Sequence, residues 1–115
     1  MLILFAMQHF NEGSYTYYVY ILTNKHRNTF YIGVTNNLTV RLQQHLEAIK
    51  NKTNTNTFVA RYSVGNLVYY EKFSWIQLAI EREKELKNWK RERKIELIRS
   101  YNYNFEFLND RFIKE

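Results

Sequence analysis

Cysteine and proline are both absent from the 115-residue chain, and only three glycines occur. Without cysteine the protein has no disulfide bond, no thiolate metal site and no cysteine nucleophile. The lack of proline, the scarcity of glycine and the absence of an internal repeat leave nothing that marks a linker between domains. We therefore expect one compact domain, a size at which roughly 65% of the unfolded chain's surface becomes buried.

Long hydrophobic runs are also missing, and none approaches the roughly 18 apolar residues that a membrane-spanning helix needs. The apolar start from Met1 to Met7 is short and has no basic residue before it, so it is a poor secretory signal. We interpret residues 1–14 as an appendage, with Met7 as an alternative start, and residues 15–115 as a single domain. The expected protein is soluble and cytoplasmic.

Acidic residues are outnumbered, because seventeen Lys and Arg against eleven Asp and Glu give a net charge of +6. A basic surface favours polyanionic partners through neutralisation of phosphates and release of counterions. Hydrophobic residues make up 45% and aromatic residues 17% of the chain, which argues against disorder.

Two tyrosine-rich and β-branched segments, Tyr17 to Thr23 and Thr29 to Val34, flank the polar run from Asn24 to Asn28. This pattern predicts a β-hairpin. Because side chains alternate along a strand, Tyr18 and Tyr20 should share one face and leave the intervening side chains on the other.

The second strand should present Tyr31 and Gly33 on one face. Tyr31 joins Tyr20 on the same face of the sheet only if the loop between them holds an even number of residues. Loops from Asn24 to Arg27 or from Lys25 to Asn28 satisfy this condition, and we predict such a register.

A helix should follow, since Asn36 and Asn37 are good N-caps. Its apolar stripe has the spacing of residues that face a core and consists of Leu38, Leu42, Leu46 and Ile49. Arg41 and His45 lie one step round the helix, and we expect both to point toward the edge of the sheet.

The second half of the chain begins with a polar loop from Asn51 to Thr57, a segment of a kind that often carries binding surface. A short helix from Phe58 to Tyr62 and a third strand from Leu67 to Glu71 are predicted next. Ser74 and Gln77 have the spacing of a capping box, which predicts a helix starting at Ser74.

Glu83 lies on the apolar stripe of this next helix and therefore needs a partner there. The stripe consists of Ile76, Ala79, Ile80 and Leu86. The stretch from Lys87 to Arg99 is interpreted as a basic helical face anchored by apolar side chains. Its predicted nucleic-acid-binding residues are Lys87, Lys90, Arg91 and Lys94.

Several of these segments, taken in order, resemble the GIY-YIG nuclease family over roughly Tyr17 to Ile98. They are Tyr18-Val19-Tyr20, Tyr31-Ile32-Gly33, "RLQQH" with Arg41 and His45, and "AIERE" ending at Glu83. The chain is most similar to the small bacterial single-domain branch, in which an "LVYYE" strand precedes a basic "REKELKxW" helix. Such members resemble catalytic modules of nucleotide-excision-repair incision subunits, junction-processing nucleases and homing endonucleases.

The resemblance implies an α+β fold, with a three-stranded antiparallel sheet flanked by helices, and a divalent-metal-dependent endonuclease that cuts DNA. One Mg²⁺ or Mn²⁺ ion would bind weakly without substrate. The matching site residues are Tyr20, Tyr31, Arg41 and His45 as catalytic groups and Glu83 as the metal ligand. Tyr18 departs from the pattern, because the family has glycine there.

Hydrolysis of a phosphodiester needs an aligned, deprotonated water and stabilisation of the anionic phosphorus and leaving oxygen. A hard carboxylate such as Glu83 suits Mg²⁺, and the planar fork of Arg41 suits a phosphate. Tyr20 would orient or deprotonate the water, and Tyr31 would hydrogen-bond water or phosphate. His45 competes with Tyr20 as general base, since the reference pKa of tyrosine is near 10 and that of histidine near 6.5. Tyr20 is preferred.

Each residue also has an ordinary structural role when considered alone: tyrosines pack, and Glu83 could pair with Arg82 or Lys87. Their joint occurrence in order favours a site, where Gly33 would let backbone or substrate approach closely. We expect branched, flapped or single-stranded-containing DNA as substrate, and no obligate protein partner is predictable.

Two other functions are consistent with the same residues. A non-catalytic nucleic-acid-binding module would stack bases on Tyr18, Tyr20 and Tyr31. A protein-interaction domain on a decayed nuclease scaffold would show neither DNA affinity nor metal dependence.

Overall fold

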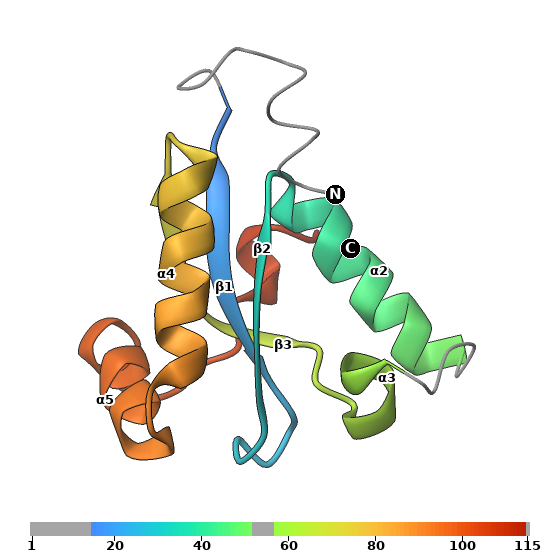
Figure 1. Cartoon of the computed structure of the whole chain (residues 1–115). Helices are drawn as coiled ribbons and strands as arrows, with labels where there is room; N and C mark the ends of the chain where they lie inside the picture. Colours follow the sequence, from blue (N-terminus) through green and yellow to red (C-terminus); the bar gives the residue numbers. More distant parts are fainter. Residues whose placement is uncertain (1–14, 52–56, 115) are drawn as a thin grey trace.

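The computed structural model describes residues 15–51 and 57–114, which form a three-stranded antiparallel sheet flanked by helices (Figure 1). The strand order is β2-β1-β3, with β1 (Tyr17–Thr23) in the centre and β2 (Phe30–Thr35) and β3 (Asn66–Phe73) at the edges. The predicted α+β fold is confirmed. Residues 1–14, predicted as an appendage, lie outside the described residues.

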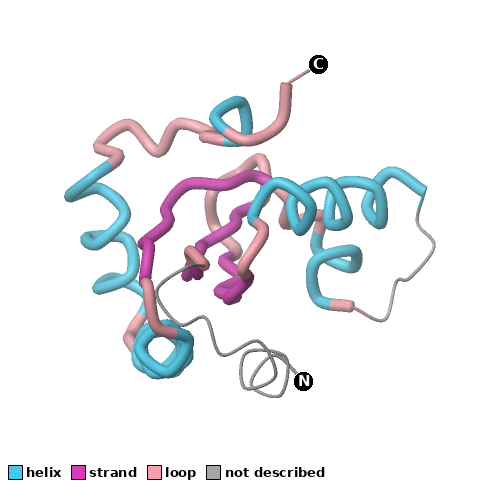
Figure 2. The backbone as a smooth tube through the Cα atoms, turned by 90° about the horizontal axis from the view of Figure 1, so that it is seen from above, coloured by secondary structure: helices cyan, strands magenta, loops and turns pink. Residues whose placement is uncertain are grey.

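Helices cover the sheet from both sides, as the view from above shows (Figure 2). The first side carries α2 (Leu38–Asn51) and the short α3 (Phe58–Tyr62), and the second carries α4 (Ile76–Asn88) and α5 (Arg91–Tyr101). A 3-10 turn, η1 (Asn109–Arg111), lies in the C-terminal segment. In the described part of the chain, no helix has the length and apolar character needed to span a membrane.

The hairpin has the predicted even register. Tyr20 pairs with Gly33 and Leu22 pairs with Tyr31, which is the register of the loop from Lys25 to Asn28. Directly paired residues share a face, so Tyr20, Tyr31 and Gly33 lie on the same side of the sheet. The Thr23 hydroxyl donates to the Thr29 carbonyl at 2.9 Å and closes the loop.

Two apolar layers follow from strand alternation. The layer under α4 and α5 contains Tyr17, Val19 and Ile21 of β1, together with buried residues of both helices, Ile76, Ala79, Leu86 and Ile98. The layer under α2 contains Tyr20 and Leu22 with Leu38, Leu42, Val59, Val64 and Leu67. The sheet is therefore packed on both faces, and the predicted stripes face the core except at Leu46, which is 36% exposed.

The start of α2 is confirmed and the predicted start of α4 is wrong. Asn37 caps α2, because its side-chain oxygen accepts from the Val40 amide at 3.1 Å. At α4 the N-cap is Trp75, whose side chain makes no capping bond, and the helix begins at Ile76. Strand β3 continues to Phe73 and Trp75 keeps an extended backbone, so Ser74 lies before the cap.

The basic stretch is divided between two helices. Helix α4 ends at Asn88, Trp89 is extended, and Lys90 is the N-cap of α5. Trp89 packs against the core, and the guanidinium groups of Arg82 and Arg93 lie 5.1 and 3.9 Å from its ring centroid. The packed indole interrupts the helix that the charge pattern alone suggested. The predicted loop from Asn51 to Thr57 falls largely outside the described residues.

Candidate active site

The centre of the site is the Tyr20 phenol, which lies across the edge strand. A Cβ atom built on Gly33 would lie 2.6 Å from the Tyr20 Oη and 2.7 Å from its Cζ. The phenol therefore occupies the volume that a side chain at position 33 would take. Gly33 does allow a close approach, as predicted, but the group that approaches is Tyr20 rather than backbone or substrate.

His45 contacts this hydroxyl from α2. The Tyr20 Oη and His45 Nε2 atoms are 3.1 Å apart. The helix is oriented by the Asn37 cap and by the buried Leu38 and Leu42, which turn the His45 side of α2 toward the sheet. Burial, and then the charge of Arg41, lowers the pKa of His45 from 6.5 to about 4. The imidazole is therefore neutral near pH 7, and its Nε2 can accept a hydrogen bond from the phenol hydroxyl.

Arg41 lies one helical turn before His45 and acts on the same hydroxyl. The pKa of Tyr20 is raised well above its usual 10, first by burial and then by the neighbouring Tyr31 and Glu83. The charge of Arg41 and its hydrogen bonding to the phenol oppose this rise. Tyr20 is consequently protonated at neutral pH, and Arg41 is the group that stabilises negative charge there.

Tyr31 completes the aromatic part of the site from β2. Its ring centroid is 6.3 Å from that of Tyr20 and 5.7 Å from that of His45. A hollow of about 330 Å³ opens in front of these groups. It is lined by Tyr31, Arg41, Gln44, His45, Ala48, Thr57, Phe58 and Val59.

Five of these lining residues were not predicted as site residues: Gln44, Ala48, Thr57, Phe58 and Val59. Gln44 follows Arg41 by three residues and so lies on the same helix face, a signal that the spacing offered. The Phe58 ring stacks on Tyr31 with centroids 6.2 Å apart. No sequence signal identified Phe58, because its position depends on how α3 packs.

Glu83 reaches the site from α4, which packs against both β1 and β2. Its side chain is 18% exposed, and its carboxylate lies 3.5 Å from the Lys87 Nζ. Its charge is one of those that raise the pKa of Tyr20. Of the two alternative partners, Lys87 is the one observed, because Arg82 pairs with Glu71 and Glu85.

The donor set around Glu83 fits one hard divalent cation. Among the described residues no group of three His, Asp or Glu side chains could hold a metal ion. A single half-buried carboxylate oxygen would leave most of the shell to water and substrate oxygens, which Mg²⁺ accepts.

The predicted nucleic-acid-binding residues are spread along α4 and α5. Lys87 lies one turn after Glu83, and Lys90 stands at the start of α5. The Arg91 Nη2 donates to the Asn28 carbonyl in the hairpin loop. Lys94 is half-buried on α5. Lys87 is therefore the one paired with Glu83, and Arg91 is the one that contacts the hairpin.

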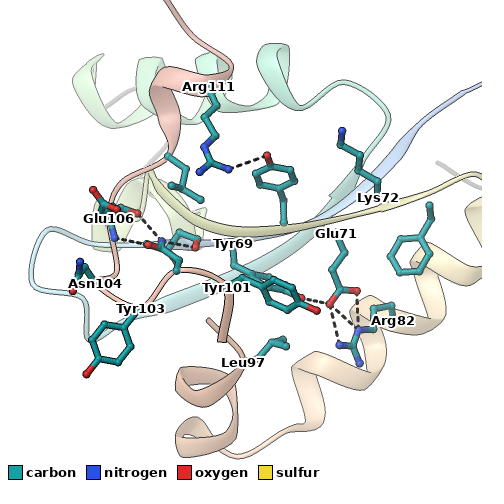
Figure 3. A pocket seen from close by; sticks show the side chains of 15 residues that line it. Tyr69, Glu71, Lys72, Arg82, Leu97, Tyr101, Tyr103, Asn104, Glu106 and Arg111 are labelled. Carbon is teal, nitrogen blue, oxygen red and sulfur yellow. Dashed lines mark hydrogen bonds and ion pairs between the residues drawn. The ribbon is translucent and has the colours of Figure 1, made fainter. Parts of the chain in front are cut away.

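A larger cavity, of about 880 Å³, lies along β3 and contains none of the predicted site residues (Figure 3). In it the Tyr69 hydroxyl donates to Glu71, whose carboxylate also binds Arg82 at 2.9 Å. Burial and this hydrogen bond raise the pKa of Tyr69. The network joins β3 to α4 next to Glu83, so we interpret it as structural support for that helix.

Comparison with known proteins assigns this chain to a family. The family model of the GIY-YIG catalytic domain matches residues 16–96. Among solved structures, the NMR structure of the UPF0213 protein BH0048 from Bacillus halodurans is 26% identical, with a TM-score of 0.48, covering 83% of this chain and 95% of that one. No curated protein matches. Since the family model covers more than half of the chain, the protein belongs to the GIY-YIG nuclease family.

Proposed function

We propose that the protein is a divalent-metal-dependent endonuclease that hydrolyses DNA phosphodiester bonds, either selectively for DNA structure or non-specifically, and without strong sequence preference. Membership of a nuclease family gives the reaction class. The observation that carries the proposal is the contact of the Tyr20 hydroxyl with His45, beside the Tyr31 ring, where the charges of Arg41 and Glu83 both act on the pKa of Tyr20.

In this proposal Tyr20 contacts and orients the attacking water. The phenol is protonated at rest. The Nε2 of His45 lies 3.1 Å from the phenol oxygen and accepts its hydrogen bond, while the pKa of about 4 makes the imidazole a weak proton acceptor at neutral pH. Tyr20 is therefore preferred over His45 as the general base, and the charges of Arg41 and of a bound cation would lower its pKa.

Arg41 would bind the non-bridging oxygens of the scissile phosphate. Its five N–H donors form a planar fork that matches phosphate geometry. Tyr31, on the neighbouring strand β2, would hydrogen-bond the phosphate or the water. A divalent cation held by Glu83 would supply positive charge at the phosphate and at the leaving oxygen.

The test is cleavage of labelled duplex, single-stranded, flap and four-way-junction DNA with Mg²⁺, Mn²⁺ or EDTA. Glu83→Gln and Arg41→Ala should each lower the cleavage rate at least ~100-fold, which is the effect of removing one transition-state donor. Glu81→Gln is the matched control, because it removes an exposed carboxylate from the same helix. It should cleave like the wild type.

Equal cleavage by wild type and Glu83→Gln would reject the enzyme proposal and indicate a contaminating nuclease. Binding of DNA without any cleavage, unaffected by Glu83→Gln, would instead support the non-catalytic module. A preference for one DNA shape in the panel would identify the substrate class.

A further inference from the structure

Three arginines gather where the β1–β2 hairpin meets α5, and we call Arg27, Arg91 and Arg99 the hairpin arginine patch. Arg27 belongs to the hairpin loop, while Arg91 and Arg99 lie two turns apart on one side of α5. All three side chains belong to exposed residues. Ile95 lies between the two helical arginines along α5. Together with Arg27 and Arg99, it lines a hollow at this end of the molecule.

Each guanidinium of the patch lies over a phenylalanine ring. Arg27 is 4.1 Å from the centroid of Phe107, Arg91 is 5.5 Å from Phe30, and Arg99 is 5.7 Å from Phe105. Such stacking holds the cation in place and leaves the N–H groups at its edge able to donate to acceptors.

The backbone also fixes this patch. Arg27 has a left-handed conformation with φ of 60°, which is uncommon for a residue with a side chain. Its Nε donates to the Phe105 carbonyl at 3.0 Å and its Nη1 to the Lys25 carbonyl at 3.2 Å. The Arg91 Nη2 donates to the Asn28 carbonyl. The side chains are therefore ordered before any partner binds, which reduces the entropy lost on binding.

No carboxylate neutralises these cations within residues 15–51 and 57–114, since none of the three forms an ion pair there. A hollow of about 400 Å³ adjoins two of them, Arg27 and Arg99, and is also lined by Ile95, Tyr103, Asn104 and Phe105. The nearest acidic residues of α5, Glu92 and Glu96, line a different hollow beside Trp89. The patch thus presents concentrated, ordered positive charge.

The patch continues the basic side of α4. This helix runs beside the sheet and leads into α5 at the hairpin end (Figure 1). Glu83 is followed by Lys87 on α4 and by Lys90 at the start of α5. On β2, Phe30 precedes Gly33 by three residues, about 10 Å along the strand, and its side chain lies on the other face of the sheet, in the layer under α4 and α5. A DNA arm would need about three base pairs to cover that distance and about six to pass Arg27.

We infer that the hairpin arginine patch is a second phosphate-binding surface, which holds the backbone of a DNA arm extending from the scissile phosphate past the hairpin. The inference rests on the proposed function, because it assigns that site an arm of its substrate. It reassigns Arg91 from a general helix contact to a fixed cluster and adds Arg27 and Arg99.

The experiment measures binding by fluorescence anisotropy in EDTA, with flap DNA whose duplex arms are 3, 6, 12 and 18 base pairs long. Wild type should bind arms of 6 base pairs or more at least ~10-fold more tightly than the 3-base-pair arm. The triple variant Arg27→Gln, Arg91→Gln, Arg99→Gln should lose that length dependence. Its log–log salt slope should fall by about two to three, because each phosphate contact contributes about 0.9.

Two controls separate the patch from general charge and from folding. Lys72→Gln, Lys84→Gln and Lys114→Gln together remove the same charge from other exposed positions and should keep the arm-length dependence. The double variant Arg91→Gln, Arg99→Gln retains the backbone anchors of Arg27 and should reduce the salt slope by about two.

Three outcomes would overturn the inference. The first is an equal effect of the patch and control triples, and the second is arm-length dependence that survives in the patch triple. The third is displacement of DNA by millimolar inorganic phosphate beyond the effect of chloride at equal ionic strength, which indicates a pocket for a single phosphate. Because binding is measured without metal, absence of cleavage would reject the proposed function and leave this test valid.

Discussion

At the residue scale, the site depends on the missing side chain of Gly33, because the Tyr20 ring occupies the space that a side chain there would fill. The central strand places the tyrosine and the edge strand provides the space, so each residue explains the other. The bond from the phenol to His45 then requires that the ring remain in this position.

Gly33→Ala should destabilise the protein by about 1–3 kcal/mol and reduce cleavage, because the new Cβ would meet the rigid Tyr20 ring. Gly65→Ala is the matched control. A Cβ there meets the flexible side-chain ends of Ile49 and Leu46, at 2.8 and 2.9 Å, and should cost less. Chemical unfolding measures both. Tyr20→Leu combined with Gly33→Ala should recover most of the stability, and failure to recover would refute the account that the Tyr20 ring needs this space.

His45 should make stability depend on pH. Its pKa is lowered from 6.5 to about 4 in the folded protein, so between these values the unfolded chain binds more protons. The contribution is fully present above pH 6.5 and is lost as the pH falls to about 4. Because His45 is partly exposed, we expect only about 1 kcal/mol, or about 4 °C in Tm.

The measurement compares Tm at pH 7 and pH 4.5 for wild type, His45→Asn and His26→Asn. The first variant should lose part of the decrease seen in wild type. The second alters an exposed loop histidine and should behave like wild type. Identical pH dependence in all three proteins would mean that His45 does not carry the effect.

At the element scale, α2 delivers both Arg41 and His45, so its start determines half of the site. The sequence offered two caps, and the structure uses Asn37. Asn37→Ala should cost about 1 kcal/mol by freeing the Val40 amide, whereas Asn36→Ala should cost little. Urea midpoints measure the difference. A larger loss for Asn36→Ala would place the helix start one residue earlier.

The division between α4 and α5 shows how packing overrides a charge pattern. Lys87 to Arg99 has helical spacing, yet the packed Trp89 separates the two helices and turns Arg91 to the hairpin. One continuous helix would have carried its basic residues away from the sheet. The break therefore creates the hairpin arginine patch.

At the scale of the whole molecule, the C-terminal segment returns to close one edge of the sheet. The Leu108 amide donates to the Leu67 carbonyl at 2.7 Å, and the Asn109 side chain contacts both Leu67 and Gly65. Phe112 packs edge-on against Tyr18 and Tyr70. The segment thus completes the core layer behind the candidate site.

Asn102 connects this segment to β3. It is 8% exposed, its side-chain nitrogen donates to the Val68 and Glu106 carbonyls, and its oxygen accepts from the Glu106 amide. Asn102→Ala should cost about 2–3 kcal/mol, because it leaves buried backbone groups without partners. Asn104→Ala, at an exposed position, is the control. Thermal unfolding should show a clear difference, and equal Tm values would contradict this role.

The prediction from sequence was accurate where neighbouring residues decide the outcome. Strand alternation placed Tyr20 and Tyr31 on one face, and helical spacing placed Arg41 beside His45. It failed at the start of α4, where the tertiary extension of β3 moved the cap from Ser74 to Trp75. The roles of the site residues remain predictions that the cleavage assay tests.

The sequence alone determined the family, the three strands and the side on which each tyrosine lies, because spacing along the chain sets which residues share a face. Only the tertiary structure decided that Tyr20 lies over Gly33, that Glu83 acts on it from across the edge strand, and that Arg27 meets Arg99. Such contacts join residues far apart in the chain, and the pKa of a buried group depends on packing that no local pattern contains.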